Sequence, residues 1–427
     1  MPAIDPKLAR EFAVDVVRRL RESGYQALWA GGCVRDQLMA MLPKDYDVAT
    51  DAVPERVREV FGKRRTLEIG AAFGVVTVLG PREAGQIDVA TFRRDAGYSD
   101  GRHPDAVTFS DAEHDAQRRD FTINGLFFDP LAEQVIDYVG GRDDLQRRIV
   151  RAIGDPRARI AEDKLRMLRA VRFAARFDFA IDADTLAAVK EQAHELVIVS
   201  AERIATELRL ILTHPNRARG AELLVETNLL EILLPEIGLV LQNSEQWPRT
   251  IAALAGLHQP TFPMALAALI REIESPADRK VLAQSVCQRW KLSNEETSGV
   301  EKLLTEETTI RNARSEYWPK LQRILTAPRV TELLGYCEAV VRAIDNDLSH
   351  IDFCREKLAL PPADLNPVPL ITGEDLKQLG IPQGPEYRRL LEAVRDAQLE
   401  RKITTEEEAL TYAQNLKSKI GNLKSEI

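Results

Sequence analysis

Two aspartates that follow a glycine turn are the residues of this 427-residue chain with the most direct potential for chemistry. Asp45 and Asp47 stand two positions apart, so their carboxylates would share one face of a strand. Gly31 and Gly32 precede them, and a helix predicted over Val34 to Leu42 would point its first N–H groups back at that turn. Paired carboxylates beside a turn that can hold an anion are what phosphoryl transfer with two Mg²⁺ ions requires.

The segments that must position these residues alternate between helix and strand patterns up to about residue 150. An amphipathic helix is predicted over Lys7 to Glu22, and the apolar run Ala27 to Ala30 predicts a short strand before the glycine turn. Two β-rich runs, Gly74 to Leu79 and Gln86 to Phe92, flank a turn and predict a hairpin. After them the pattern predicts a polar loop, a strand or short helix, and a further strand, over residues 97–104, 122–128 and 133–138.

A third carboxylate falls on the second strand of the predicted hairpin. Asp88 could complete a metal triad with Asp45 and Asp47, or it could act as a general base toward an attacking hydroxyl. It could equally be an ordinary surface aspartate of a strand. The spacing alone leaves both interpretations open.

The run from Arg118 to Asn124 combines two cations, a carboxylate and an amide within seven residues. Arginine can clamp phosphate oxygens with two parallel hydrogen bonds. Asp120 and Asn124 could read ribose hydroxyls, which would distinguish an NTP from a dNTP. A solvated turn is the alternative for this run taken by itself.

A single helix is predicted over Ile160 to Ala174, with charged side chains at every third position. Asp163 and Arg166 could form an ordinary salt bridge, worth only about 0.2–0.5 kcal/mol. They could instead hydrogen-bond the edge of a base, while Arg169 and Arg172 hold a triphosphate. The apolar side chains of the same segment are expected to face the core: Leu165, Leu168, Phe173 and Phe177.

The charge of the chain is unevenly distributed. Its formal net charge is −8, which argues mildly against nucleic-acid binding over the whole surface. Between Arg147 and Arg176, however, ten basic residues stand against three acidic ones. This basic stripe predicts either a solvated helix face or a groove for a triphosphate and a polynucleotide backbone.

Composition excludes several other classes of protein. Hydrophobic residues make up 44% of the chain, and no apolar run reaches the length of a membrane span. The cysteines show no Cys-x-x-Cys spacing, so a zinc site and a disulfide framework are not expected, and a cytoplasmic location is predicted. They are Cys33, Cys287, Cys337 and Cys354.

Beyond about residue 150 the strand patterns fade and apolar residues recur at helical spacing. Helices are predicted over Ala201 to Leu212, Ala218 to Leu233 and Met264 to Glu272. A proline-rich break from Leu360 to Pro369 precedes a predicted helix start at Thr372, and residues 404–427 are charged and helical or frayed. The chain is therefore expected to be α+β, with an α/β head and a long all-helical remainder.

The order of these motifs resembles that of the class II tRNA nucleotidyltransferases of the polymerase β-like superfamily, over about residues 25–215. The motifs are Gly-Gly-x-x-Arg-Asp, Asp-x-Asp, Arg-Arg-Asp-x-x-x-Asn and Glu-Asp-x-x-Arg. That family contains CCA-adding enzymes, relatives that add part of CCA, and bacterial poly(A) polymerases. The resemblance implies a polymerase β-like catalytic head (1–150), a helical neck (151–215), a body (216–355) and a tRNA-binding tail (356–427).

The resemblance also implies roles for individual residues. Asp45, Asp47 and Asp88 would bind Mg²⁺ and carry catalysis. Asp163 and Arg166 would select CTP and then ATP as a protein template, and the helical part would grip the acceptor arm of tRNA. The other nucleotide-binding residues would be Gly31, Gly32, Arg35, Asp36, Arg119, Asp120, Asn124, Arg169 and Arg172.

Two features bear on the subtype. Poly(A) polymerases of this family carry an Arg-Arg-Phe-type segment after the Asp-x-Asp helix and a strongly basic C-terminus. Here the segment is Glu68 to Val76 and the C-terminus is mixed in charge, which favours tRNA end addition. The loop from Arg93 to Phe109 resembles the flexible loop that CCA-adding and A-adding enzymes need for switching to ATP. CCA addition is the favoured function, A addition to CC-ended tRNA is the main alternative, and poly(A) synthesis or a catalytically inactive RNA-binding protein are lesser ones.

Overall fold

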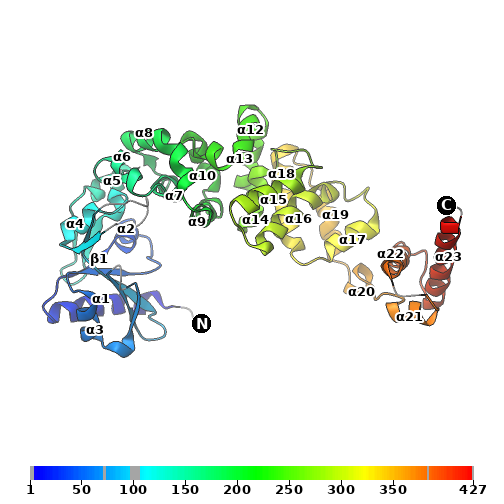
Figure 1. Ribbon diagram of the computed structural model, residues 1–427, viewed down its shortest axis with the longest axis horizontal. Helices are drawn as coiled ribbons and strands as arrows, with labels where there is room; N and C mark the ends of the chain where they lie inside the picture. Colours follow the sequence, from blue (N-terminus) through cyan, green and yellow to red (C-terminus); the bar gives the residue numbers. More distant parts are fainter. Residues whose placement is uncertain (1–3, 71–73, 97–105, 382–383, 426–427) are drawn as a thin grey trace. The chain divides into compact units, whose positions relative to one another are not determined.

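The structure is a computed structural model that describes residues 4–70, 74–96, 106–381 and 384–425. It divides into two compact units, Met1–Gly238 and Leu239–Ile427 (Figure 1). The first unit contains a sheet and helices, and the described part of the second is helical. The α+β class predicted from the sequence is confirmed.

A seven-stranded sheet organises the first unit, with strand order β3-β4-β5-β2-β1-β8-β9. Strands β2 and β5 pair in parallel, and the remaining neighbours pair antiparallel. The predicted hairpin is confirmed as β4 and β5. The strands are β1 (Ala27–Ala30), β2 (Asp47–Thr50), β3 (Thr66–Gly70), β4 (Val75–Leu79), β5 (Gln86–Thr91), β8 (Leu126–Asp129) and β9 (Gln134–Asp137).

Alternating side chains of β1 build a core on each face of this sheet. Trp29 belongs to a core shared with helices α1 (Pro6–Glu22) and α3 (Pro54–Phe61). Leu28, on the opposite face, packs in a second core with residues of α4 (Ala112–Gln117). All four residues of β1 are buried, as expected for a strand covered on both faces.

The helix that follows the glycine turn is shorter than predicted. The predicted helix over Val34 to Leu42 is in fact α2 (Gly32–Leu38). Ala40 has φ 55°, its N–H donates to the Gln37 carbonyl at 3.0 Å, and the Met41 N–H donates to the Asp36 carbonyl at 2.8 Å. This pair of bonds is a Schellman motif, which closes a helix and turns the chain away.

Two further predicted helices are broken. The segment Ile160 to Ala174 forms α6 (Pro156–Glu162) and α7 (Arg166–Phe177), because Asp163 adopts an extended backbone with φ −147° and ψ 105°. The segment Ala218 to Leu233 forms α10 (Arg217–Glu226) and α11 (Leu229–Leu233), because Asn228 takes the left-handed conformation.

The first unit contains several further elements. Residues 122–128 contain both of the predicted alternatives, a 3₁₀ turn (Thr122–Asn124) and the start of β8. A short parallel pair beyond the sheet was not predicted, β10 (Ile149–Val150) with β11 (Ala180–Ile181). The predicted polar loop 97–104 lies outside the described residues, between the paired strands β6 (Arg93–Ala96) and β7 (Ala106–Phe109). The other helices are α5 (Gly141–Arg147), α8 (Ala183–Gln192) and α9 (Ala201–Leu212), with 3₁₀ turns at Lys63–Arg65, Ala193–Ile198 and Pro235–Ile237.

The described part of the second unit is a succession of helices. Thr372 and Asp375 form a capping box at the start of α21, as the predicted helix start requires. No helix in the described ranges is both long and apolar enough to span a membrane. The helices are α12 (Gly238–Gln242), α13 (Gln246–Gly256), α14 (Phe262–Ile270), α15 (Arg279–Arg289), α16 (Asn294–Arg311), α17 (Trp318–Leu325), α18 (Val330–Ile344), α19 (Ser349–Leu358), α20 (Pro362–Leu365), α21 (Gly373–Gln378), α22 (Pro385–Leu399) and α23 (Glu406–Ser425).

Candidate active site

A polar cleft of about 440 Å³ in the first unit gathers ten of the eleven predicted nucleotide-binding residues. The eleventh, Asp36, does not line the cleft but pairs with two residues that do, Arg35 and Arg176. The predicted residues that line it are Gly31, Gly32, Arg35, Arg119, Asp120, Asn124, Asp163, Arg166, Arg169 and Arg172. Segments far apart in the sequence therefore meet in one place.

The glycine turn allows an arginine to approach the backbone closely. Gly31 has φ 69°, and a Cβ at this position would lie 2.7 Å from Nη1 of Arg119. Its N–H donates to the carbonyl of Leu126 at 2.9 Å, which ties the turn to the central sheet. The turn thus requires glycine for its backbone conformation and for the space that Arg119 occupies.

A buried hydrogen-bond chain forms the wall of the cleft next to this turn. Arg35 donates through Nε and Nη2 to Asp36 at 2.8 and 2.6 Å, and through Nη1 to Asn124 at 2.5 Å. The amide of Asn124 donates to Asp120 at 3.0 Å. Burial lowers the pKa of the Arg35 guanidinium, and the charge of Asp36 opposes that shift. The donors of Arg35 are largely occupied within the protein, so Arg35 and Asp36 shape the wall.

Asp120 is the buried anion of the cleft. Arg169 donates to its carboxylate through Nε at 2.8 Å and through Nη2 at 2.5 Å. Burial by itself would raise the pKa of Asp120, but the charge of Arg169 and hydrogen bonds from Asn124, Arg169 and the Phe121 N–H lower it to about 2. Asp120 is therefore ionised at neutral pH and fixes the direction of Arg169.

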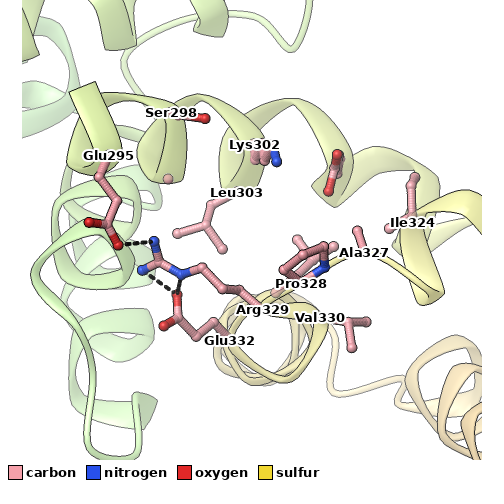
Figure 2. A pocket seen from close by; sticks show the side chains of 13 residues that line it. Glu295, Ser298, Lys302, Leu303, Ile324, Ala327, Pro328, Arg329, Val330 and Glu332 are labelled. Atoms are coloured by element: carbon pink, nitrogen blue, oxygen red, sulfur yellow. Dashed lines mark hydrogen bonds and ion pairs between the residues drawn. The ribbon is translucent and has the colours of Figure 1, made fainter.

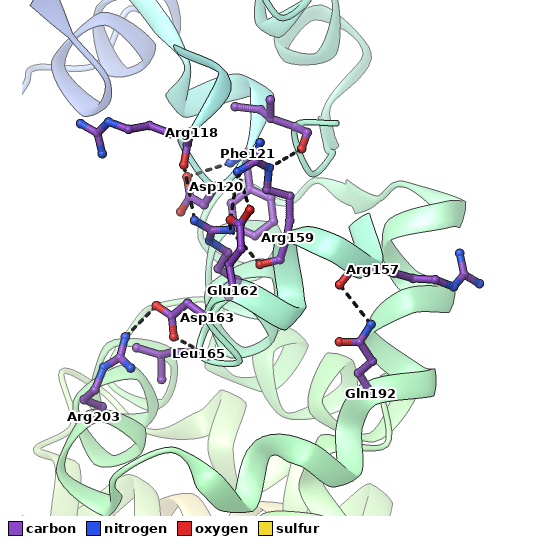
Figure 3. Close-up of polar contacts among 12 residues, drawn as sticks. Arg118, Asp120, Phe121, Arg157, Arg159, Glu162, Asp163, Leu165, Gln192 and Arg203 are labelled. Atoms are coloured by element: carbon purple, nitrogen blue, oxygen red, sulfur yellow. Dashed lines mark hydrogen bonds and ion pairs between the residues drawn. The ribbon is translucent and has the colours of Figure 1, made fainter. Parts of the chain in front are cut away.

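Asp163 and Arg166 do not pair with each other, which excludes the simple salt bridge. Asp163 accepts from Arg203 of α9 at 2.7 Å and from the N–H of Leu165 at 3.1 Å (Figure 3). Arg166 donates to Glu162 at 2.6 Å and to the carbonyl of Arg159 at 2.7 Å. Each side chain is held by separate partners while both line the cleft. The cleft is thus lined by a carboxylate and a guanidinium that are not paired with each other, the two kinds of group that can hydrogen-bond the edge of a base.

The basic stripe from Arg147 to Arg176 is not a continuous free groove. Eight of its ten basic residues form ion pairs within the chain. Arg172, for example, forms an ion pair with Glu207 at 2.7 Å and lies 4.3 Å from the centroid of the Phe173 ring. Acidic residues, most of them on other elements, therefore neutralise most of the stripe.

Three residues of the cleft were not among the predicted binding residues: Arg118, Phe173 and Arg176. Arg118 and Arg119 share one acceptor, the buried carboxylate of Asp115, at 2.7 and 3.0 Å. Arg176 follows Arg172 by four residues on α7, so the helical spacing of the arginines could have identified it. Phe173 was assigned only to the core, and it is indeed buried while its ring also lines the cleft.

The three predicted catalytic carboxylates do not line the cleft. Two of them lie on neighbouring interior strands of the seven-stranded sheet. Asp47, the first residue of β2, is the register partner of Asp88 on β5. Asp45 precedes β2, so the prediction that both Asp45 and Asp47 lie on a strand is wrong for Asp45. Asp88 also accepts from the hydroxyl of Thr77 at 2.6 Å.

These carboxylates form a negatively charged site whose chemistry suits a hard divalent cation. Asp47 is exposed at the surface, but the surrounding protein removes part of its hydration, which raises its pKa to about 6. The charges of Asp45 and Asp88 add to that shift, and Arg119 opposes it. Carboxylate oxygens are the ligands that Mg²⁺ prefers. Within the described ranges, no three metal-ligating side chains already stand in a ready-made cluster. The donor set fits a divalent ion, and ligation would require the three carboxylates to converge.

The second unit contains a separate cavity of about 230 Å³ between α16 and the start of α18 (Figure 2). Its most prominent cation, Arg329, pairs with Glu332 at 2.8 Å and with Glu295 at 3.5 Å. None of the motif residues identified in the sequence lines this cavity. The polar cleft of the first unit is therefore the candidate active site.

Comparison with known proteins finds matches along most of the chain. The poly A polymerase head domain matches residues 27–151, and tRNA nucleotidyltransferase domain 2 matches residues 265–413. Residues 178–239 match a segment described as an RNA- and SrmB-binding site of polymerase A. The regions that these three matches cover include the head, most of the neck and most of the second unit.

Several of the similar proteins are CCA-adding enzymes. The CCA-adding enzyme of Lactobacillus helveticus is 32% identical over 392 residues, which are 90% of this chain and 91% of the relative. That of Limosilactobacillus reuteri is 34% identical over 302 residues, 70% of this chain and 72% of the relative. The crystal structure of the Bacillus stearothermophilus CCA-adding enzyme in complex with CTP is 28% identical, with a TM-score of 0.77 over 97% of this chain and 99% of that one.

Proposed function

The chain belongs to the family of CCA-adding tRNA nucleotidyltransferases, and from this premise we propose that it adds CCA to the 3′ end of tRNA from CTP and ATP without a nucleic-acid template. The observation that carries this proposal is the cleft itself. It brings arginines that can bind phosphate together with Asp163 and Arg166, which are held by separate partners. The charge of one of these arginines, Arg119, acts on Asp47 of the carboxylate group. Its substrates are then the acceptor arm of tRNA, CTP and ATP.

Selection of the nucleotide is the task that we assign to Asp163 and Arg166. Arginine donates and aspartate accepts, so together they can match the hydrogen-bonding edge of cytosine and, after a change of arrangement, that of adenine. Arg203 and Glu162 hold the two side chains from different elements. The choice between CTP and ATP then needs no base pairing with a nucleic-acid template.

The other cleft residues are proposed to bind and orient the rest of the nucleotide. Arg169 and Arg172 are placed to hold the triphosphate, and Arg119 lies between the cleft and the carboxylates, since its charge acts on Asp47. Asp120 and Asn124 are placed to contact the ribose. Gly31 and Gly32 have no side chains, so they leave room for the phosphates at this wall of the cleft.

Nucleotidyltransferases generally use a divalent metal ion, for which we propose Mg²⁺ held by Asp45, Asp47 and Asp88. When bound, it supplies positive charge that activates the tRNA 3′-hydroxyl and stabilises the departing pyrophosphate. The carboxylates fix the position at which the 3′-hydroxyl meets the α-phosphate, and the arginines of the cleft orient the triphosphate for in-line displacement.

The domain assignment follows from the same proposal. Residues 1–150 are the catalytic head, 151–215 the neck with the selecting residues, and 216–355 and 356–427 the body and the tRNA-binding tail. We place the enzyme in the cytoplasm, because its four cysteines are buried and unpaired, as a reducing compartment favours.

The alternative to exclude is A addition alone. A tRNA transcript that lacks CCA and is given CTP alone should gain two nucleotides under the proposed function. An A-adding enzyme would leave this transcript unchanged and would extend only a CC-ended tRNA from ATP.

A further inference from the structure

The basic stripe contains a second group of arginines that the nucleotide cleft does not use. Eight of its ten basic residues are neutralised by acidic partners, as described above. The exceptions are Arg147 and Arg148, at the end of α5, and one turn earlier the same helix carries Arg142. All three are exposed, and none has an ion-pair partner among the residues that the structure describes. An unpaired cationic cluster in a chain of net charge −8 points to an anionic partner.

Two of these arginines line a cleft of about 330 Å³ that is distinct from the nucleotide cleft. Arg142, Gln146 and Arg148 supply its polar groups. Its apolar lining comes from Leu38, Met39, Leu145 and Phe179. No acidic residue lines it, although Asp143 is exposed elsewhere on the same helix. Cationic forks beside apolar surface suit a sugar-phosphate strand better than a free inorganic anion.

The backbone of this cleft is firmly held, so its shape is set before any ligand arrives. Arg148 caps α5 in the left-handed conformation, and its N–H donates to the Leu145 carbonyl at 3.2 Å. Its own carbonyl accepts from Ala180 at 2.9 Å, which joins α5 to the β10–β11 pair. Asp137 fixes the other end of α5 through four backbone N–H groups, including that of Arg142 at 2.9 Å. Within the part of the chain that the structure describes, these guanidinium groups form no ion pair, while the backbone that carries them is held by hydrogen bonds.

Helix α2 connects this cleft to the catalytic site. Gly32 and Arg35, at its start, line the nucleotide cleft, whereas Leu38, at its end, lines the arginine cleft. A helix of this length spans about 10 Å, a distance that a few nucleotides of a strand can cover. The loop after α2 leads to Asp45 and exposes Leu42, which is 67% exposed.

We infer that the cleft between the end of α2 and helix α5 binds the phosphate backbone of the tRNA acceptor strand, a few nucleotides before its growing 3′ end. Arg142 and Arg148 bind phosphate oxygens, and the charge of Arg147 adds to the positive electrostatic potential beside them. This inference rests on the proposed function, because it takes the RNA partner from there. It adds a specific site that holds the strand while CTP and ATP change in the neighbouring cleft.

The test compares the variants Arg142→Ala, Arg148→Ala and the double variant with the wild-type enzyme. The readouts are the Kd for tRNA at several salt concentrations, the KM for CTP and kcat at saturating tRNA. Arg82→Ala is the matched control, since Arg82 is exposed in the β4–β5 turn of the same unit and has no ion-pair partner in the described ranges. Each binding measurement is repeated with a minihelix that contains only the acceptor stem and T arm.

We expect Kd to rise on the order of threefold to tenfold for each arginine, with the salt dependence of log K falling by about one unit of slope per contact. The loss of affinity should be the same for full-length tRNA and for the minihelix. KM for CTP and kcat should stay at wild-type values. Affinities equal to that of Arg82→Ala would overturn the inference, as would a loss confined to full-length tRNA. If the wild-type chain added no CMP or AMP to any tRNA, the proposed function itself would fail, which is a separate result.

Discussion

Asp47 and Asp88 stand directly opposite each other on neighbouring parallel strands, β2 and β5. In that register their Cα atoms are partners, and Asp45 lies two residues before Asp47 in the chain. The consequence appears at Asp47, which is exposed yet partly desolvated by the surrounding protein: that loss of hydration and the two neighbouring negative charges raise its pKa to about 6. A divalent cation is the natural means of relieving this repulsion.

Removing one of these carboxylates should abolish turnover and leave RNA binding intact. For Asp47→Asn and Asp88→Asn we expect kcat to fall on the order of 10³-fold or more, because the charge that would hold the cation is lost. Asp51→Asn is the control, since Asp51 is an exposed aspartate just after β2. Single-turnover CMP incorporation measures the loss, and tRNA affinity should stay within twofold. Wild-type turnover in either variant would refute the carboxylate assignment.

Asp163→Ala should blur the choice between CTP and ATP more than it slows the reaction. Asp163 is held by Arg203 and not by Arg166, so its removal leaves Arg166 on Glu162 and takes away the acceptor of the pair. The ratio of kcat/KM for the correct over the wrong nucleotide should fall on the order of tenfold. Arg157→Ala, which breaks an exposed ion pair with Glu191, is the control. An unchanged ratio would return Asp163 to a purely structural role.

Asp115 is expected to position two arginines of the nucleotide cleft. Its carboxylate accepts from both Arg118 and Arg119, and it is 1% exposed, so it cannot itself reach a ligand easily. In Asp115→Asn the two guanidinium groups lose their common anchor, and KM for both nucleotides should rise on the order of tenfold with a smaller change in kcat. Asp129→Asn breaks a comparable buried ion pair, with Arg21, away from the cleft. Equal KM values in the two variants would contradict a positioning role.

Asp120 should make the head more stable at neutral than at acidic pH. Its pKa in the folded protein is about 2, below the ordinary value of 3.8, so its contribution is fully present above about pH 4 and is lost as the pH falls toward 2. The shift corresponds to a contribution on the order of 2 kcal/mol. We expect the difference in unfolding free energy between wild type and Asp120→Asn to be constant from pH 5 to 7 and to shrink below pH 4. Hydrogen exchange of the peptide that contains Phe121, measured at each pH, reports this difference in stability. A difference that does not depend on pH would contradict the assignment.

Most residues that line the polar cleft could be predicted from the sequence, because they belong to short local motifs. Glycine pairs, alternating carboxylates and arginines at helical spacing each occupy a few consecutive residues. The same reasoning could not find Arg203 as the partner of Asp163, since 40 residues separate them and α9 carries no distinctive pattern. Sequence reasoning also placed Asp163 within one helix. The helix in fact ends after Glu162, but no glycine or proline stands there to indicate the break.

The carboxylate site shows a second limit of the sequence. The hairpin of β4 and β5 was predictable from its turn and its β-rich runs. The parallel pairing of β5 with β2, which puts Asp88 opposite Asp47, depends on how α3 and β4 carry the chain back to the sheet. Register between strands that are distant in sequence is a tertiary property, so the third carboxylate could only be suspected.

The most direct test of the account is incorporation on three tRNA transcripts that end before CCA, after the first C and after CC. Each is incubated with CTP and ATP, singly and together, in the presence of Mg²⁺, and the 3′ ends are sequenced. The account predicts that all three are completed to CCA and that extension then stops. Extension of the CC-ended transcript alone, long A tails, or no incorporation at all would each contradict it.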